Sequence, residues 1–220
     1  MPQRHDWEIS AKEAVQLQRE LAARVTNRWS KRGVTLVGGV DTSYRKGKAR
    51  AAVVVVTYPD LEPVEQVTTQ RPVDFPYVPG LLSFREGPAV MDALPRLKRK
   101  PDLLIFDGQG IAHPRRFGIA SHIGVLVGIP SIGCAKSRLV GEYQEPGMER
   151  GSFSFLFHKG DTVGAVVRTR SRVKPVFVST GHLIDLSTSI SFVLTCCRRY
   201  RLPETTRLAD KLAGAWGDEK

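Results

Sequence analysis

The chain has 220 residues, 41% of them hydrophobic and 25% charged, which is enough to bury a core and excludes a disordered or low-complexity protein. Its formal net charge of +11, from 33 Lys and Arg against 22 Asp and Glu, favours a polyanionic partner such as nucleic acid. Its three cysteines make neither an even disulfide framework nor a zinc site. No apolar run approaches the roughly 20 residues of a membrane span, so we expect a cytoplasmic protein without a membrane segment.

The first predicted elements are a helix and a group of strands. Ser10 and Glu13 have the spacing of a capping box, and an apolar stripe at helical spacing follows from Ala14 to Val25. A turn is expected at residues 31–33. Short apolar or β-branched runs separated by short turns then predict an antiparallel meander of strands over residues 35–41, 51–58 and 64–69.

Helices and strands alternate in the rest of the chain. A helix is expected over residues 81–97, interrupted or bent near Pro88, and a strand–helix–strand unit after it predicts a parallel crossover. The later elements are expected in the order strand 102–107, helix 118–128, strand 131–135, strands 162–167 and 176–179, a helix capped by Asp185 or Ser187, and a helix over 206–215. No repeat or composition break marks a second domain. We therefore expect one α/β domain over residues 1–220, with three layers and a mixed β-sheet flanked by helices.

Two aspartates stand at the ends of predicted strands. Asp41 and Asp107 each follow a compact apolar run, and each alone is most often a turn or helix-capping aspartate. If the two strands are neighbours, both carboxylates meet at one edge of the sheet, where open α/β sheets bind ligands. On so basic a chain, paired acids favour metal-dependent phosphodiester chemistry, because Mg²⁺ takes hard oxygen ligands and bridges to phosphate.

Two further charged residues are candidates for the same site. Glu86 lies in the predicted helix, where an exposed glutamate is the alternative interpretation. Lys136 directly follows the strand over residues 131–135. Near carboxylates this lysine would stabilise developing negative charge or position the attacking water, whereas alone it would be a surface lysine. His122 and His182 are each expected to be structural histidines rather than ligands.

Basic residues gather in four runs, at residues 96–100, 115–116, 168–174 and 198–201. A single run is usually a solvated face, so only their number supports nucleic-acid binding. Aromatic residues interleave little with these runs, which argues against an aromatic stacking platform for long single strands.

Several long motifs resemble those of the endonuclease V family. The two longest are PYVPGLLSFREGP at residues 76–88 and DGQGIAHPRRFGIASH at residues 107–122. Shorter matches lie at residues 39–41, 133–137, 179–182 and 200–204. The resemblance covers residues 7–212 approximately, with the motifs in the order that the family has them.

The resemblance implies a ribonuclease H-like fold and an endonuclease that recognises deaminated purines, such as inosine (hypoxanthine), in nucleic acid. Such an enzyme hydrolyses the second phosphodiester bond 3′ to the lesion in DNA repair, with Mg²⁺ as its cofactor and Mn²⁺ able to replace it. The implied partners are DNA containing deaminated bases and, as a further substrate, inosine-containing RNA. A monomer is expected.

The resemblance also implies roles for individual positions. Asp41, Glu86 and Asp107 would bind the metal ion, and Lys136 would be catalytic together with these acids. Asp210 falls where some members carry histidine and others aspartate, and either would bind the metal or a metal-bound water. A wedge that separates strands is implied at Pro76, Tyr77, Val78 and Pro79. A pocket for the flipped base is implied at Gly80, Leu82, Gly108, His113 and Ile119.

Two alternatives stay open. Relatives in the same family act as endoribonucleases on inosine-containing RNA, and the sequence does not separate DNA from RNA because contacts to 2′-hydroxyls come from ordinary residues. The other alternative is a non-catalytic nucleic-acid binding protein on a ribonuclease H-like scaffold. The presence of all three acids and of Lys136 argues against it.

Overall fold

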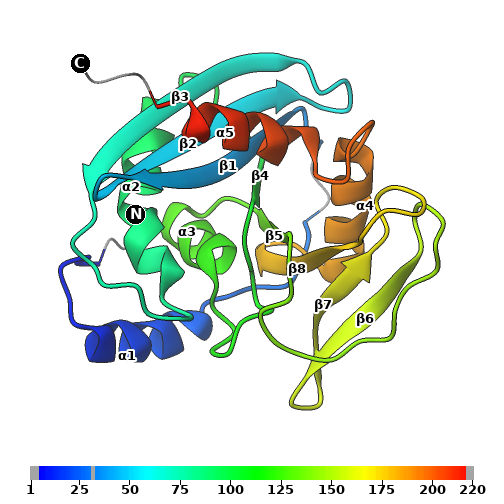
Figure 1. Ribbon diagram of the computed structural model, residues 1–220, viewed down its shortest axis with the longest axis horizontal. Coiled ribbons are helices and arrows are strands. Elements are labelled where there is room, and N and C mark those ends of the chain that lie inside the picture. Colours follow the sequence, from blue (N-terminus) through cyan, green and yellow to red (C-terminus); the bar gives the residue numbers. More distant parts are fainter. Residues whose placement is uncertain (1–4, 31–32, 217–220) are drawn as a thin grey trace.

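The computed structural model describes residues 5–30 and 33–216, and across them the chain forms one eight-stranded mixed sheet in the order β3-β2-β1-β4-β5-β8-β7-β6 (Figure 1). The strands are β1 (Leu36–Arg45), β2 (Lys48–Thr57), β3 (Pro63–Pro72), β4 (Leu103–Phe106), β5 (Ser131–Ala135), β6 (Phe153–His158), β7 (Asp161–Val167) and β8 (Val176–His182). The helices are α1 (Ala11–Ala22), α2 (Leu82–Ala93), α3 (Ile119–Val127), α4 (Leu186–Cys196) and α5 (Glu204–Gly214), with a 3₁₀ turn at Leu94–Arg96. The turn expected at residues 31–33 falls largely outside the described residues.

The antiparallel meander and the parallel crossover predicted from the sequence are both confirmed. β1, β2 and β3 pair antiparallel as a meander, and β4, α3 and β5 form a crossover in which β4 and β5 are parallel. β4 also pairs parallel with β1, whereas β8, β7 and β6 continue the sheet antiparallel from β5. The sheet is therefore mixed.

Helices cover both faces of the sheet. On one face α4 and α5 pack against Val37, Val54 and Ile105, and on the other α2 and α3 pack against alternate residues such as Val53 and Leu104. This alternation follows from the period of two along a strand, which sends successive side chains to opposite faces. The three-layer, ribonuclease H-like α/β fold expected from the sequence is confirmed. Within the described ranges, the structure contains no helix of the length and apolarity that a membrane crossing requires.

The helix caps and ends follow the local sequence closely. Ser10 and Glu13 form the predicted capping box of α1, and Asp185, rather than Ser187, caps α4 by accepting a hydrogen bond from the Thr188 N–H. Gly128 ends α3 in the left-handed region with φ 66°, which glycine adopts without the steric penalty of a Cβ atom.

One predicted helix is wrong in part, and one strand was not predicted. α2 continues through Pro88 without interruption and ends at Ala93. Its buried face, including Ala89 and Val90, packs against the sheet and α3, and this packing outweighs the hydrogen bond lost at the proline. β6 was not predicted, although Phe153, Phe155 and Phe157 alternate with the period of two that is typical of a strand; these three side chains are exposed, and only Leu156 of this strand is buried.

A glycine sets the distance between α5 and the sheet. A Cβ atom at Gly39, on β1, would lie 2.1 Å from the backbone carbonyl carbon of Thr205 in the first turn of α5. No side chain fits there, so the helix backbone rests directly on the strand. The close approach matters for the site described below, because α5 also carries Asp210.

The first prediction concerns this contact. Gly39→Ala should destabilise the protein by about 1–3 kcal/mol, as overpacking does, which corresponds to a fall in Tm of roughly 2–12 °C for a chain of this size. Gly214→Ala is the matched control, because Gly214 ends the same helix with open space around it and normal φ. Thermal unfolding measured by circular dichroism checks the pair. Equal Tm values for Gly39→Ala and the wild type would contradict the assigned contact.

Candidate functional site

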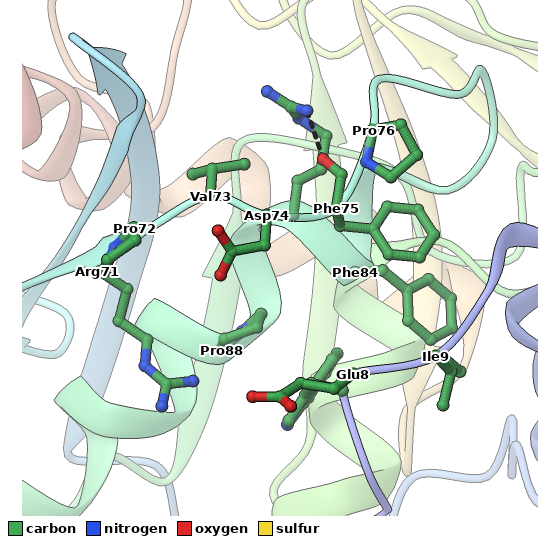
Figure 2. Close-up of a pocket in the computed structure, with 12 residues that line it drawn as sticks. Glu8, Ile9, Arg71, Pro72, Val73, Asp74, Phe75, Pro76, Phe84 and Pro88 are labelled. Carbon is green, nitrogen blue, oxygen red and sulfur yellow. Dashed lines mark hydrogen bonds between the residues drawn. The ribbon is translucent and has the colours of Figure 1, made fainter.

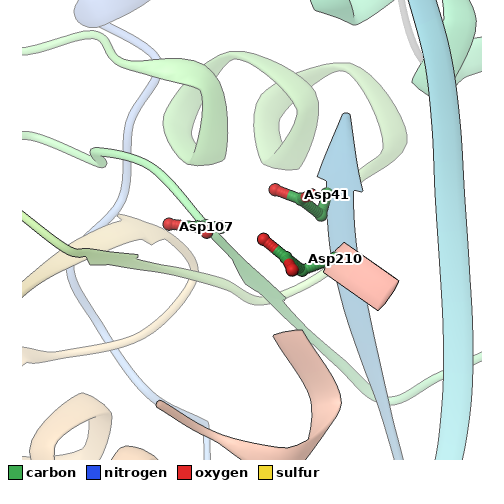
Figure 3. A group of neighbouring side chains, drawn as sticks. All are labelled: Asp41, Asp107 and Asp210. Atoms are coloured by element: carbon green, nitrogen blue, oxygen red, sulfur yellow. The ribbon is translucent and has the colours of Figure 1, made fainter. Parts of the chain in front are cut away.

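Three aspartates from separate elements converge at one edge of the sheet (Figure 3). Asp41 lies on β1, Asp107 directly follows β4, and Asp210 projects from α5; each offers a carboxylate oxygen, and these atoms all lie within 4.8 Å of one another. An all-oxygen donor set of this kind suits a hard divalent cation such as Mg²⁺, which prefers carboxylate and water ligands. The cluster could therefore hold a metal ion.

The β1–β4 ladder explains why Asp41 and Asp107 meet. Their parallel pairing ends at Val40 opposite Phe106, and the Asp107 N–H donates to the Val40 carbonyl at 3.1 Å. Both aspartates thus come immediately after the last paired residues. The prediction that Asp41 ends its own strand is wrong, because β1 continues to Arg45 in its pairing with β2. What ends at this point is only its pairing with β4.

Glu86 is buried on α2 rather than exposed on the helix surface, with 8% of the residue accessible to solvent. It lies outside the three-aspartate group, but the charges of Asp41 and Asp107 act on it, and the Tyr44 hydroxyl donates a hydrogen bond to it. Arg85 stacks over the Tyr44 ring at 5.1 Å. The alternative of a solvated helical glutamate is therefore excluded, and Tyr44 is a site residue that the sequence motifs did not single out.

Lys136 joins the cluster at its centre. Its Nζ atom lies 2.5 Å from Asp107 Oδ2 and 2.9 Å from Asp210 Oδ1. Burial opposes the charged form, but the hydrogen bonds to both carboxylates outweigh it and raise the pKa of Lys136, so the ammonium stays charged. Arg201 supports this lysine from behind by donating to the Lys136 carbonyl oxygen at 2.6 Å and to the Pro175 carbonyl oxygen at 2.9 Å.

Burial and mutual repulsion keep protons on the acids. Burial, followed by the charges of Asp107 and Asp210, raises the pKa of Asp41 to about 7. Burial, followed by the charge of Asp41, raises the pKa of Glu86 to about 8, and burial raises the pKa of Asp107 as well. The cluster therefore cannot reach full ionisation near neutral pH unless additional positive charge, such as a divalent cation, compensates it.

One cleft of about 490 Å³ connects the acids to most of the residues expected around a substrate. Asp41, Glu86, Asp107 and Lys136 line it. All of the expected base-pocket residues line the same cleft, namely Gly80, Leu82, Gly108, His113 and Ile119. Nine further residues line the cleft without having been candidates from the sequence: Gln18, Thr42, Ser83, Gln109, Gly118, Ala135, Ser137, Arg138 and Leu139. Of these, Ser83, Gln109 and Gly118 stand within the two longest matching motifs, and Ala135 and Ser137 within a shorter match.

Hydrogen bonds fix the backbone of the pocket at Gly80. The His113 Nδ1 atom accepts from the Arg115 N–H at 3.2 Å, so Nε2 carries the proton and donates to the Gly80 carbonyl at 2.9 Å. Burial, followed by the charge of Arg115, lowers the pKa of His113 to about 4, so the ring is neutral. Gln18, on α1, donates to the same Gly80 carbonyl at 3.0 Å.

The loop over residues 76–79 places three of its four residues in the cleft and Pro76 outside it. Tyr77, Val78 and Pro79 line the cleft, and Tyr77 is the most exposed of the large hydrophobic residues, at 74%. Pro76 instead lines a neighbouring cavity of about 630 Å³ between the N-terminal segment, the end of β3 and α2 (Figure 2). In that cavity Arg85 donates to the Phe75 carbonyl at 2.6 Å, which ties the loop to the helix that carries Glu86.

Two histidines are structural, as expected. His122 is fully buried, with Nδ1 2.9 Å from the Ser83 hydroxyl and Nε2 2.7 Å from His5 Nε2. His182 accepts from the Thr26 N–H at 3.3 Å. Neither belongs to the group of acids that could hold a metal ion.

Comparisons with known proteins agree with this geometry. The family model for endonuclease V matches residues 17–211. The endonuclease V of Trichormus variabilis is 53% identical over 214 residues, which are 96% of this chain and 97% of the relative, and that of Roseiflexus sp. is 53% identical over 207 residues, 94% and 93% of the two chains.

Solved structures are similar over the same length. The crystal structure of endonuclease V from Streptomyces avermitilis has a TM-score of 0.90 at 46% identity, covering 94% of this chain and 92% of that one. Endonuclease V from Ciona intestinalis, in complex with a 24mer DNA containing an inosine followed by a ribo-adenosine, has a TM-score of 0.78 at 30% identity, covering 92% and 95%.

The second prediction concerns the pH dependence of stability without metal. Because the folded-state pKa values of Asp41 and Glu86 are raised to about 7 and 8 from 3.8 and 4.5, the folded protein binds more protons than the unfolded chain between those values. Their contribution to the free energy of unfolding is therefore largest at low pH and is lost as pH rises towards 8. Asp41→Asn should flatten this fall relative to the wild type.

Thermal unfolding in a metal chelator between pH 5 and pH 8 measures this slope. Asp60→Asn is the control, because Asp60 lies exposed in the turn after β2. Added Mg²⁺ should raise the wild-type Tm more at pH 8 than at pH 5, since protons compete with the cation for the same carboxylates. A slope unaffected by Asp41→Asn would contradict the raised pKa of Asp41.

Proposed function

The chain belongs to the endonuclease V family, and from that membership we propose that it is a Mg²⁺-dependent endodeoxyribonuclease that recognises deaminated purines, inosine (hypoxanthine) above all. It hydrolyses the second phosphodiester bond 3′ to the lesion and acts in DNA repair. The observation that carries the proposal is the convergence of three aspartates within 4.8 Å beside the Lys136 ammonium, on a chain of net charge +11. A basic protein with an acidic centre suits metal-dependent cleavage of a polyanion.

The acids would hold the metal ion. Asp41, Asp107 and Asp210 supply carboxylate oxygens, and Glu86 supplies a fourth acid next to them. Bound Mg²⁺ would supply the Lewis-acid chemistry that activates water and neutralises charge on the phosphate, and Mn²⁺, with the same oxygen preference, would replace it. Without a cation the pKa of Glu86 is raised to about 8 by burial and by the neighbouring acids, so binding of a divalent cation would favour its ionised form.

Lys136 would stabilise negative charge that develops on the phosphate. Its ammonium lines the cleft at the level of the carboxylates, and Arg201 fixes its backbone from behind. A preorganised cation in a partly buried site is worth more than one in water, because it needs no reorganisation when the charge develops.

The pocket around Gly80 and Gly108 would receive the flipped base. Its polar backbone is held in place by His113 and Gln18, so its hydrogen-bonding groups are fixed before the base arrives. Hypoxanthine presents an oxygen and a ring N–H where adenine presents an amino group and a bare nitrogen. A fixed pocket discriminates between them because the wrong base leaves buried polar groups unpaired. Flipping is also cheapest for a mispaired base.

Cleavage of inosine-containing RNA is the second candidate function. The Ciona intestinalis relative binds a DNA in which a ribo-adenosine follows the inosine, so a 2′-hydroxyl beside the lesion fits within this family's cleft. Cleavage rates on matched inosine-containing DNA and RNA strands decide between the two. If the protein only binds nucleic acid, it should bind inosine-containing strands without Mg²⁺ and give no cleavage product with any metal ion.

The third prediction tests the metal site. Asp41→Ala should abolish cleavage of a labelled duplex carrying one inosine while binding of the same duplex stays within a few-fold of wild type, because the removed oxygen serves the cation rather than the base. Wild-type protein should give one Mg²⁺-dependent product 3′ to the inosine and none on an undamaged duplex. Asp60→Ala, which removes an exposed turn aspartate, should cleave normally. Full activity of Asp41→Ala would refute the metal assignment.

The fourth prediction tests the wedge. Tyr77→Ala should slow cleavage of inosine in a duplex by on the order of tenfold, as expected for one lost stacking contact of about 1–3 kcal/mol, and should affect a single-stranded substrate much less, because only a duplex has to be opened. Tyr200→Ala, an exposed tyrosine on the α4–α5 connection, is the control. An equal loss on both substrates would argue that Tyr77 contributes to general binding instead.

A further inference from the structure

Three phenylalanines stand exposed in a row on the edge strand β6. Phe153, Phe155 and Phe157 are 47%, 47% and 48% exposed, and neighbouring rings touch edge to face with centroids 5.6 and 6.3 Å apart. Large apolar side chains are usually buried, and a contiguous exposed set marks an interaction surface more often than a scattered one does. We call these three side chains the β6 row.

The β6 row borders a groove instead of a flat surface. Phe153 and Phe155 form one wall, and Leu186, Ile190 and Leu194 of α4 form the other. The groove has a volume of about 590 Å³. Its lining contains one charged group, Asp185, whose carboxylate is engaged in capping α4 through Thr188. The groove therefore offers apolar surface to a ligand with planar or apolar groups.

Cations stand at both ends of the β6 row. At the Phe153 end, Arg150 donates to the Leu194 and Cys197 carbonyls at 2.7 and 3.2 Å, and so lies beside the groove. At the Phe157 end, Arg116 donates to the His158 carbonyl at 2.7 Å and pairs with Asp161 at 3.1 Å, and the exposed Lys159 follows in the hairpin turn. Aromatic rings between positive charges are the combination that binds single-stranded nucleic acid, with bases on the rings and phosphates near the cations.

The β6 row is continuous with the rim of the cleft. The Phe157 backbone exchanges hydrogen bonds with Glu142 at 2.7 and 2.9 Å. Ser137, Arg138 and Leu139 line the cleft, so only two residues separate that lining from the segment paired with β6. A nucleic-acid strand that leaves the cleft past Leu139 reaches the row at Phe157 first.

From these contacts we propose that the β6 row is a second nucleic-acid subsite, which stacks two or three unpaired bases of the strand that runs out of the cleft. The proposal rests on the proposed function, which places nucleic acid in the cleft. The slight interleaving of aromatic residues with the basic runs argues against a stacking platform for long single strands, and the row provides only a short one. A second copy of the chain is the less favoured occupant, because two chains of net charge +11 repel each other.

The test compares single-stranded probes that differ in length. A fluorescein-labelled core oligonucleotide with one inosine is extended by eight thymidines at either its 5′ or its 3′ end, and affinities are measured by anisotropy in a metal chelator. One of the two extensions should tighten binding to the wild type by about tenfold or more, since each stacked base contributes roughly that factor. In the triple variant Phe153→Leu, Phe155→Leu and Phe157→Leu, which keeps apolar bulk but removes the rings, the extension should add nothing.

Three controls distinguish the loss of a stacking subsite from a loss of stability and from a failure of the proposed function. Met148→Ala changes another exposed apolar residue and should keep the gain from the extension. The single variant Phe155→Leu, with its Tm measured, should lose part of the gain without loss of stability. Mg²⁺-dependent cleavage of the unextended core by wild-type protein reports on the proposed function alone.

Two results would overturn the proposal. One is a wild type that gains nothing from either extension, or a triple variant that gains as much as the wild type. The other is a wild-type dimer, seen by light scattering, that the triple variant converts to a monomer with its affinity for extended probes unchanged. That outcome would assign the β6 row to contact between copies of the chain.

Discussion

Three carboxylates held within 4.8 Å of one another are the constraint on which the rest of this structure depends. Two full negative charges at that distance repel by about 3–4 kcal/mol if the effective dielectric constant is about 20. Folding therefore has to impose the arrangement. The parallel β1–β4 ladder delivers Asp41 and Asp107 side by side, and the docking of α5 on Gly39 delivers Asp210. The raised pKa values of the acids report the burial and mutual repulsion that remain after packing has brought the carboxylates together.

Lys136 reduces that repulsion and links the cluster to the surrounding framework. It bridges Asp107 and Asp210, so one ammonium connects the end of β4 to α5. Arg201, from the connection between α4 and α5, holds the Lys136 carbonyl. Arg201 and Asp210 lie close together in the chain, on the α4–α5 connection and on α5. The same segment therefore positions both Lys136 and one of the acids that it contacts. A change that shifts α5 would move both together, which is why the buried Gly39, on which α5 rests, is expected to matter.

The same organisation divides the molecule electrostatically. Acids occupy the floor of the cleft, while the chain as a whole carries a charge of +11. The surrounding positive charge attracts a polyanion, and the acidic floor gives a cation a place to bind between the polyanion and the protein. Exposed aromatic residues include Tyr77, which lines this cleft, and the three phenylalanines of β6. These side chains stay about half or more exposed to solvent.

Much of this protein could be predicted from its sequence because the decisive signals are local. Ser10 and Glu13 cap a helix, the β-branched runs build a meander, and Asp107 follows its strand; each depends on neighbours a few residues away. The long motifs likewise identified the residues that now line one cleft. The burial of Glu86, its contact with Tyr44 and the exposed face of β6 could not be read in this way, because each depends on which surfaces pack together.

Asp210 shows most clearly which features the sequence predicts and which only the tertiary structure decides. Its position in a helix was predictable from the sequence, but its place among the acids was decided by the tertiary structure, since a backbone contact at Gly39 brings α5 onto β1. A local pattern specifies the direction of a side chain on its own helix or strand. The distance between residues far apart in the chain is set only when those elements pack, because that distance depends on the shapes of both surfaces.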